Sequence, residues 1–203
     1  MPDGRTFLRK AALSTQGRAN VQARIAKHWP GPLSATQRAE AVAVESAVEI
    51  LNSRNYRVLY VGRPGPVPGT TTHVSKGPDI VAFNPTTNRT VVVEAKGAVG
   101  DLSINNTRLK SQVVGQRRFQ PSRDWLQADA NNRYLDTLRT GNSDVSEAAA
   151  RLQRIIDGVD DYDAVVVAAS PKASLGKVDD LIEELHGDPG VSAELITLAI
   201  TVP

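Results

Sequence analysis

The sequence predicts an α/β fold in which a mixed central β-sheet is flanked by helices. Residues 90–95 begin with four β-branched residues in sequence, three of them valine, and residues 164–169 form a continuous apolar run rich in valine. Both patterns are typical of strands that are buried on both faces of a sheet. Helical periodicity alternates with short strand patterns along the rest of the chain, which favours interleaved helices and strands in one α/β layer arrangement. The 203 residues suffice to bury one sizeable core.

The N-terminal part predicts a basic helical segment, residues 1–33, placed before a main domain of residues 34–203. Helical signals cover residues 6–13 and 19–29, and the sequence Pro-Gly-Pro at 30–32 then interrupts them. Ser34 is a suitable N-cap for a longer helix over residues 35–54.

The predicted helix over 35–54 carries carboxylates among apolar residues. Glu40 lies on the same helical stripe as Val44, Val48 and Leu51, while Glu45 falls at the edge of that stripe. A buried carboxylate is costly unless it is paired or binds a metal. We therefore expect a specific partner for the carboxylate on this face.

The remaining elements follow from periodicity and turn residues. The predicted strands cover residues 56–61, 79–84, 90–95, 164–169 and 193–202, and the predicted helices cover residues 108–120, 122–138, 143–157 and 174–185. Loops are expected at 62–77, which contains Arg63 and Lys76, and at 97–107.

Composition excludes several classes of site. The chain has no cysteine, which excludes disulfides, thiolate zinc sites and iron–sulfur clusters. No apolar run is long enough to cross a bilayer, and no signal peptide is recognisable. Residues 1–140 carry 20 lysines and arginines against 10 acidic residues, whereas residues 141–203 carry 4 against 12. The basic part is suited to contact with nucleic acid.

Three charged residues form the most informative group. Asp79 opens one predicted strand, and Glu94 and Lys96 close the next. In an antiparallel hairpin these positions are neighbours, and Glu94 and Lys96 share a face because they are two residues apart. The carboxylates of Asp79 and Glu94 can bind Mg²⁺ or Mn²⁺, and the backbone carbonyl of Ala95, which lies between Glu94 and Lys96, can add a further ligand. The metal and the lysine are suited to phosphodiester hydrolysis.

This arrangement resembles the PD-(D/E)XK nuclease superfamily: a helix with glutamate, a strand, Gly77-Pro78-Asp79, and Glu94-Ala95-Lys96 at the end of a valine-rich strand. The resemblance implies a restriction-endonuclease-like mixed sheet and metal-dependent cleavage of nucleic acid. It also implies that Asp79 and Glu94 bind the metal and that Lys96 is the catalytic lysine. The family often adds a helix glutamate, which here is either Glu40, favoured by the helical stripe, or Glu45, favoured by its shorter distance to the first strand.

A narrower resemblance concerns residues 93–97 and the later sequence Gln-Pro-Ser-Arg-Asp-Trp-Leu at 120–126. Together they resemble the nuclease toxin domains of contact-dependent inhibition and other polymorphic toxin systems, apart from Pro121, where glycine is common. The resemblance implies an endonuclease toxin that cleaves tRNA or DNA. It further implies a cognate immunity protein as partner, and action in the cytoplasm of a target bacterium after delivery within a larger secreted protein.

Several polar residues are candidates for substrate binding. They are Lys76, Arg108, Gln112, Gln116 and Gln120, and the three glutamines recur every four residues on one face of a predicted helix. Two other functions fit the same residues. One is a repair or restriction nuclease that acts in its own cell, and the other is a nuclease-like module that binds nucleic acid without cleaving it.

Overall fold

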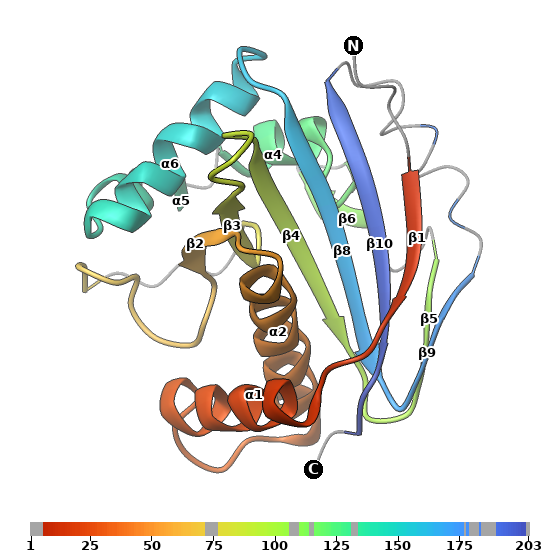
Figure 1. Ribbon diagram of the computed structural model, residues 1–203. Helices are drawn as coiled ribbons and strands as arrows, with labels where there is room; N and C mark the ends of the chain where they lie inside the picture. The colour runs from red at the N-terminus through yellow and green to blue at the C-terminus, as the bar shows by residue number, and fades with distance from the viewer. Residues whose placement is uncertain are drawn as a thin grey trace.

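The computed structural model describes residues 6–71, 77–105, 110–113, 116–130, 134–176, 178, 183 and 190–201. Its centre is a six-stranded sheet with the strand order β1-β10-β8-β4-β3-β2 (Figure 1). These strands are β1 Thr6–Ala11, β2 Arg57–Val61, β3 Ile80–Phe83, β4 Thr90–Gly97, β8 Tyr162–Ser170 and β10 Val191–Ala199.

The sheet is mixed, as the sequence predicts. β4, β8, β10 and β1 run parallel to one another, whereas β3 is antiparallel to both β2 and β4. The two valine-rich segments form β4 and β8 at the middle of the sheet. Their apolar character fits this position, because helices cover both faces of the sheet there and few side chains meet solvent. The α/β prediction with a mixed central sheet and flanking helices is therefore confirmed.

One face of the sheet is covered by α2, Ala35–Ser53, which packs in turn against α1, Thr15–His28. Ser34 caps α2 as predicted: its Oγ accepts a hydrogen bond from the backbone N–H of Gln37, and the Gln37 side chain accepts one from the backbone N–H of Ser34. Apolar side chains of α2 then pack on alternate residues of β4, including Val91 and Val93.

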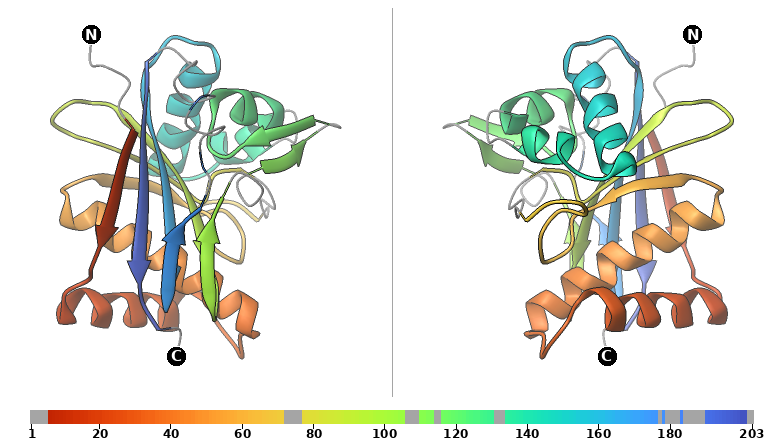
Figure 2. Two further views of the ribbon diagram at one scale, coloured as in Figure 1. Left: turned by 90° about the vertical axis from the view of Figure 1, so that its right-hand side faces the viewer. Right: turned by 90° about the vertical axis from the view of Figure 1, so that its left-hand side faces the viewer.

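The other face is covered by α4 Arg123–Ala130, α5 Tyr134–Arg139 and α6 Ser143–Ile156. Figures 1 and 2 show α1 and α2 near the end where β4 finishes, and α5 and α6 near the end where it begins. Among the described helices, none combines the length and the apolar character needed to cross a membrane.

The N-terminal segment departs from the prediction. The helix expected over residues 6–13 is the edge strand β1, which pairs in parallel with β10, while the helix expected over 19–29 is present as part of α1. Pairing with a distant strand outweighs the weak local helical tendency at 6–13. Residues 6–11, at the start of the N-terminal segment predicted over 1–33, thus belong to the central sheet.

The middle of the chain contains the largest error. The helix predicted over 108–120 is instead an antiparallel hairpin of β6 Lys110–Val113 and β7 Gln116–Phe119. The loop predicted at 97–107 contains β5 Asp101–Ile104, which pairs with β9 Lys172–Leu175. β9 also overlaps the start of the helix predicted over 174–185, most of which lies outside the described residues. In each case the pairing partner is far away along the chain or across a turn, so helical periodicity does not reveal it.

Close packing between α2 and the end of β4 depends on Gly97. A Cβ atom at this position would lie 2.0 Å from the backbone oxygen of Ala39 and 3.1 Å from the backbone nitrogen of Glu40. Only a residue without a side chain allows the helix backbone to approach the strand so closely. Gly97 therefore sets the spacing between α2 and the strand end that carries Glu94 and Lys96.

Replacing Gly97 with alanine should lower the free energy of unfolding by about 1–3 kcal/mol, because the added methyl group must displace the backbone of α2. Urea denaturation measures the loss. Gly100→Ala is the matched control, since a Cβ there meets no atom within 4 Å. Equal stability of the two variants would contradict this account of the packing.

Candidate functional site

The hairpin of β3 and β4 brings Asp79 and Glu94 together. Its register pairs Ile80 with Val93, so the preceding residue Asp79 and the following residue Glu94 come next along the ladder. The Oδ2 atom of Asp79 accepts a hydrogen bond of 2.6 Å from the backbone N–H of Ala95. The proximity expected from the sequence is therefore present at the end of the hairpin.

Asp79 lies in an environment that disfavours its charge. Burial, followed by the negative charge of Glu94, raises the pKa of Asp79 well above its ordinary value, although the Ala95 hydrogen bond and Lys96 oppose this shift. The more distant charge of Glu40 raises it slightly further. Two carboxylates held close together in a poorly solvated place are an arrangement that a cation would stabilise.

Lys96 connects the hairpin to the segment that follows β7. Its Nζ atom contacts the Oε1 atom of Glu94 and donates a hydrogen bond of 3.0 Å to the Oε1 atom of Gln120. The Lys96 side chain retains 28% exposure, whereas that of Glu94 retains only 5%. The ammonium group is thus held by two acceptors, while part of the lysine side chain remains accessible to solvent.

The backbone at Ala95 adds a possible ligand. The N–H and C=O groups of one strand residue point to the same side of the strand, and the N–H group of Ala95 points to Asp79. The carbonyl of Ala95 is consequently directed to the side where β3 has ended and Asp79 lies. Two carboxylates and one carbonyl are oxygen donors of the kind that Mg²⁺ and Mn²⁺ accept, with water in the remaining positions.

The two candidate helix glutamates have different surroundings. Glu40 is exposed, so its expected position on the buried stripe of α2 is wrong. It nevertheless lies next to the end of β4, where its backbone faces Gly97, and its charge acts on Asp79. The geometry favours Glu40 over Glu45 as the helix carboxylate that accompanies the site.

Glu45 is the buried carboxylate of α2, with a fully buried side chain. Arg63 binds it through two hydrogen bonds, from Nε to Oε1 at 2.7 Å and from Nη2 to Oε2 at 2.9 Å. The indole N–H of Trp29 donates to it at 3.0 Å, and Arg24 Nε lies 3.3 Å from Oε2. Burial alone would raise the pKa of Glu45, but the hydrogen bonds and positive charges outweigh it and lower the pKa. Glu45 is thus committed to an internal ion pair.

The structure describes the predicted substrate-binding residues only in part. Lys76 and Arg108 lie outside the described residues. Gln112 and Gln116 lie on β6 and β7, so the shared helical face predicted for the three glutamines is wrong. Gln120 follows β7 and contacts Lys96.

Among the described residues, no group of three or more histidine, cysteine, aspartate or glutamate side chains is arranged to hold a metal ion. The hairpin end offers only two such side chains, Asp79 and Glu94, and Glu94 is already paired with Lys96. This set fits Mg²⁺ or Mn²⁺ because these ions keep several water ligands and need only one or two carboxylates from the protein.

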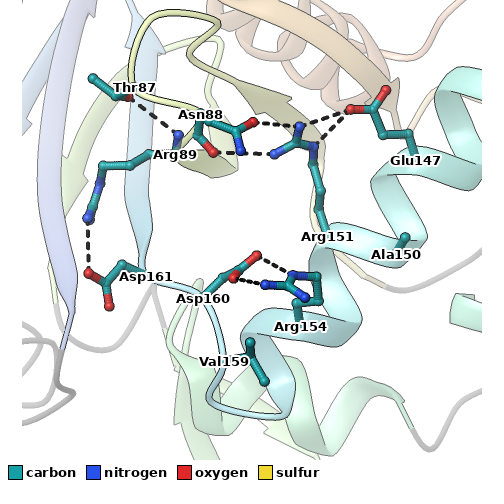
Figure 3. Close-up of a pocket in the computed structure, with 10 residues that line it drawn as sticks. All are labelled: Thr87, Asn88, Arg89, Glu147, Ala150, Arg151, Arg154, Val159, Asp160 and Asp161. Carbon is teal, nitrogen blue, oxygen red and sulfur yellow. Dashed lines mark hydrogen bonds and ion pairs between the residues drawn. The ribbon is translucent and has the colours of Figure 1, made fainter.

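A second polar region lies at the opposite end of the hairpin, in a cavity of about 590 Å³. Figure 3 shows three arginines around it, each bound to acceptors of this chain: Arg89 to Asp161, Arg151 to Glu147 and Asn88, and Arg154 to Asp160. Their donors are engaged within the chain: Arg151 connects α6 to the β3–β4 turn, Arg89 connects that turn to the segment after α6, and Arg154 connects α6 to the same segment.

Sequence reasoning did not identify Tyr60 as part of the site. Burial and the charge of Asp79 raise the pKa of Tyr60 to about 12, so its hydroxyl stays protonated and can donate a hydrogen bond. The backbone N–H of Gly62 also bonds to the backbone oxygen of Asp79 at 2.7 Å. Only the pairing of β2 with β3 reveals this proximity, since no motif contains both Tyr60 and Asp79.

Comparisons with protein-family models, with curated proteins and with solved structures found no match to this chain.

Replacing Glu45 with glutamine should destabilise the protein by about 2–4 kcal/mol, because the half-buried guanidinium group of Arg63 loses its charged partner and that of Arg24 keeps only Glu49. Glu45 has a lowered pKa in the folded chain, so its contribution is present above its ordinary value of 4.5 and is lost as the pH falls below it. The stability difference between wild type and E45Q, measured by urea denaturation, should therefore narrow between pH 6 and roughly pH 3.

The control for this measurement is Asp136→Asn. Asp136 forms an exposed ion pair with Arg139 within α5, and such pairs contribute about 0–1 kcal/mol. A loss for E45Q no larger than that of D136N would contradict the assigned role of Glu45.

Proposed function

We propose that the protein is a divalent-metal-dependent endonuclease with a restriction-endonuclease-like site of the PD-(D/E)XK type. The observation that carries the proposal is the convergence of Asp79, Glu94 and Lys96 at one end of the β3–β4 hairpin. The order of strands and the position of α2 beside this end support the same proposal.

Each residue has a distinct part in this proposal. Asp79 and Glu94, with the carbonyl of Ala95, would hold Mg²⁺ or Mn²⁺. The bound ion would stabilise charge on the phosphate and lower the pKa of a water molecule. Lys96, oriented by Gln120, faces the same place and can stabilise negative charge that develops on the phosphate oxygens. Gln120 thereby fixes the direction of the lysine.

The hydrogen bond between Lys96 and Gln120 also supports the toxin interpretation. It joins the two parts of the narrower motif, residues 93–97 and 120–126, which are separate in sequence. The rest of the second part is structural: Ser122 Oγ accepts from the backbone N–H of Trp125, and Trp125 and Leu126 are buried. A toxin of this kind would cleave tRNA or DNA in the cytoplasm of a target bacterium and would be neutralised by an immunity protein.

The purified protein should cleave total tRNA or plasmid DNA with Mg²⁺ or Mn²⁺, and EDTA should abolish the cleavage. Asp79→Asn and Lys96→Met should each reduce the rate by about 10²-fold or more, because each removes a charge that acts on the metal or the phosphate. Gel electrophoresis of the products measures the rate.

Matched controls come from the surface pair of Asp101 and Lys172, whose side chains are 77% and 78% exposed. Asp101→Asn and Lys172→Met remove the same charges away from the hairpin end and should leave the rate within about twofold of wild type. Circular dichroism verifies that all four variants are folded. A wild-type protein that cleaves neither substrate with any divalent metal would refute the proposed activity.

Expression in the bacterial cytoplasm should stop growth if the protein is a toxin, and the K96M variant should be tolerated. Colony counts after induction measure this effect, with K172M as the toxic control. If the purified enzyme cleaves nucleic acid but its expression is harmless, the toxin role is wrong and a nuclease of the host's own metabolism is favoured.

A further inference from the structure

A small pocket opens next to the candidate site, on the side of β2. It has a volume of about 220 Å³ and is lined by His28, Tyr60, Val61, Arg63 and residues 64–68. The charge of Asp79 acts on Tyr60, and the backbone N–H of Gly62 donates a hydrogen bond to the backbone oxygen of Asp79. The pocket is therefore adjacent to the place where the proposed reaction occurs.

One end of the pocket carries the oriented guanidinium group of Arg63. Two of the three guanidinium nitrogens of Arg63 bind Glu45, which orients the group, and the third, Nη1, has no acceptor among the described residues. Glu45 is also paired with Arg24, which has Glu49 as a second partner. After burial, the charge of Arg63 is the strongest influence that lowers the pKa of His28. A guanidinium group that is already oriented and keeps one nitrogen for a ligand is well suited to bind a phosphate.

The other walls come from a proline-rich segment of apolar residues. Pro64, Pro66 and Pro68 alternate with Gly65 and Val67, and proline fixes the backbone before any ligand binds. Apolar surfaces of this kind can contact the face of a nucleobase. The pocket is smaller than the roughly 300–1,000 Å³ of sites for larger ligands, and a base within a duplex cannot enter it unless the base leaves the stack.

We propose that this pocket binds one unpaired nucleotide of the substrate strand beside the scissile phosphate, with Arg63 contacting its phosphate and the proline segment contacting its base. The inference rests on the proposed nuclease function and specifies its substrate class: single-stranded nucleic acid, or unpaired loops of folded RNA. Arg63 and His28 are then residues that determine specificity.

The test introduces a negative charge into the pocket without disturbing the core. In His28→Glu the new carboxylate lies beside Arg63, where it competes with phosphate. Lys27→Glu is the matched control, because Lys27 is exposed, does not line the pocket and undergoes a larger change of charge. Arg63→Gln is a second variant, which also removes a partner of Glu45 and therefore needs its stability measured.

Binding is measured by fluorescence anisotropy in EDTA, so that it does not depend on cleavage. The probes are a labelled single-stranded RNA 8-mer, the DNA 8-mer of the same sequence, and the corresponding duplexes. We expect at least one single strand to bind more tightly than its duplex, and H28E to weaken that binding by about tenfold or more, with a smaller loss in K27E. In cleavage assays H28E should raise KM and leave kcat near that of wild type.

Three results would overturn the inference: equal losses in H28E and K27E, tighter binding of the duplexes, or a lower kcat with unchanged KM. The RNA and DNA probes distinguish the two sources of an unpaired nucleotide. If the wild-type protein cleaves substrate but H28E binds normally, only the pocket assignment fails. If wild type binds single strands through the pocket but cleaves nothing with any metal, the nuclease proposal fails instead.

Discussion

The antiparallel register between β3 and β4 is the constraint on which the candidate site depends. Ile80 pairs with Val93, and this places Asp79, which precedes Ile80, beside Glu94, which follows Val93. A shift by one residue would turn Glu94 and Lys96 to the opposite face, toward α2. The register is held by valines buried on both faces of β4, so the apolar core determines where the charges lie.

The charged side chains around this core fall into two kinds, those paired with an opposite charge and those at the hairpin end. Glu45 and Arg63 compensate each other between α2 and the segment after β2, and the arginines near the β3–β4 turn are bound to acidic residues and carbonyls. The hairpin end differs, because there two carboxylates are accompanied by one lysine and the pKa of Asp79 is raised. An internal ion pair stabilises the fold, whereas this unbalanced group is suited to bind a cation and a phosphate.

The site and the adjacent pocket share structural supports. Gly97 allows α2 to approach the end of β4, and α2 carries Glu45, which orients Arg63 at the pocket. The backbone bond between Gly62 and Asp79 joins the pocket wall to the carboxylate. A substrate strand that contacts Arg63 would consequently pass the wall that Gly62 shares with Asp79, which links the proposed specificity to the proposed chemistry.

The sequence by itself determined the α/β class, the central strands and the meeting of Asp79 with Glu94 and Lys96. These features depend on local patterns, namely apolar runs, the two-residue repeat of a strand and the length of a hairpin. The tertiary structure decided that Glu45 pairs with Arg63, that Gln120 reaches Lys96, and that residues 6–11 and 110–119 form strands. Such contacts depend on which distant segments become neighbours, and a pattern read along one stretch of chain does not contain that information.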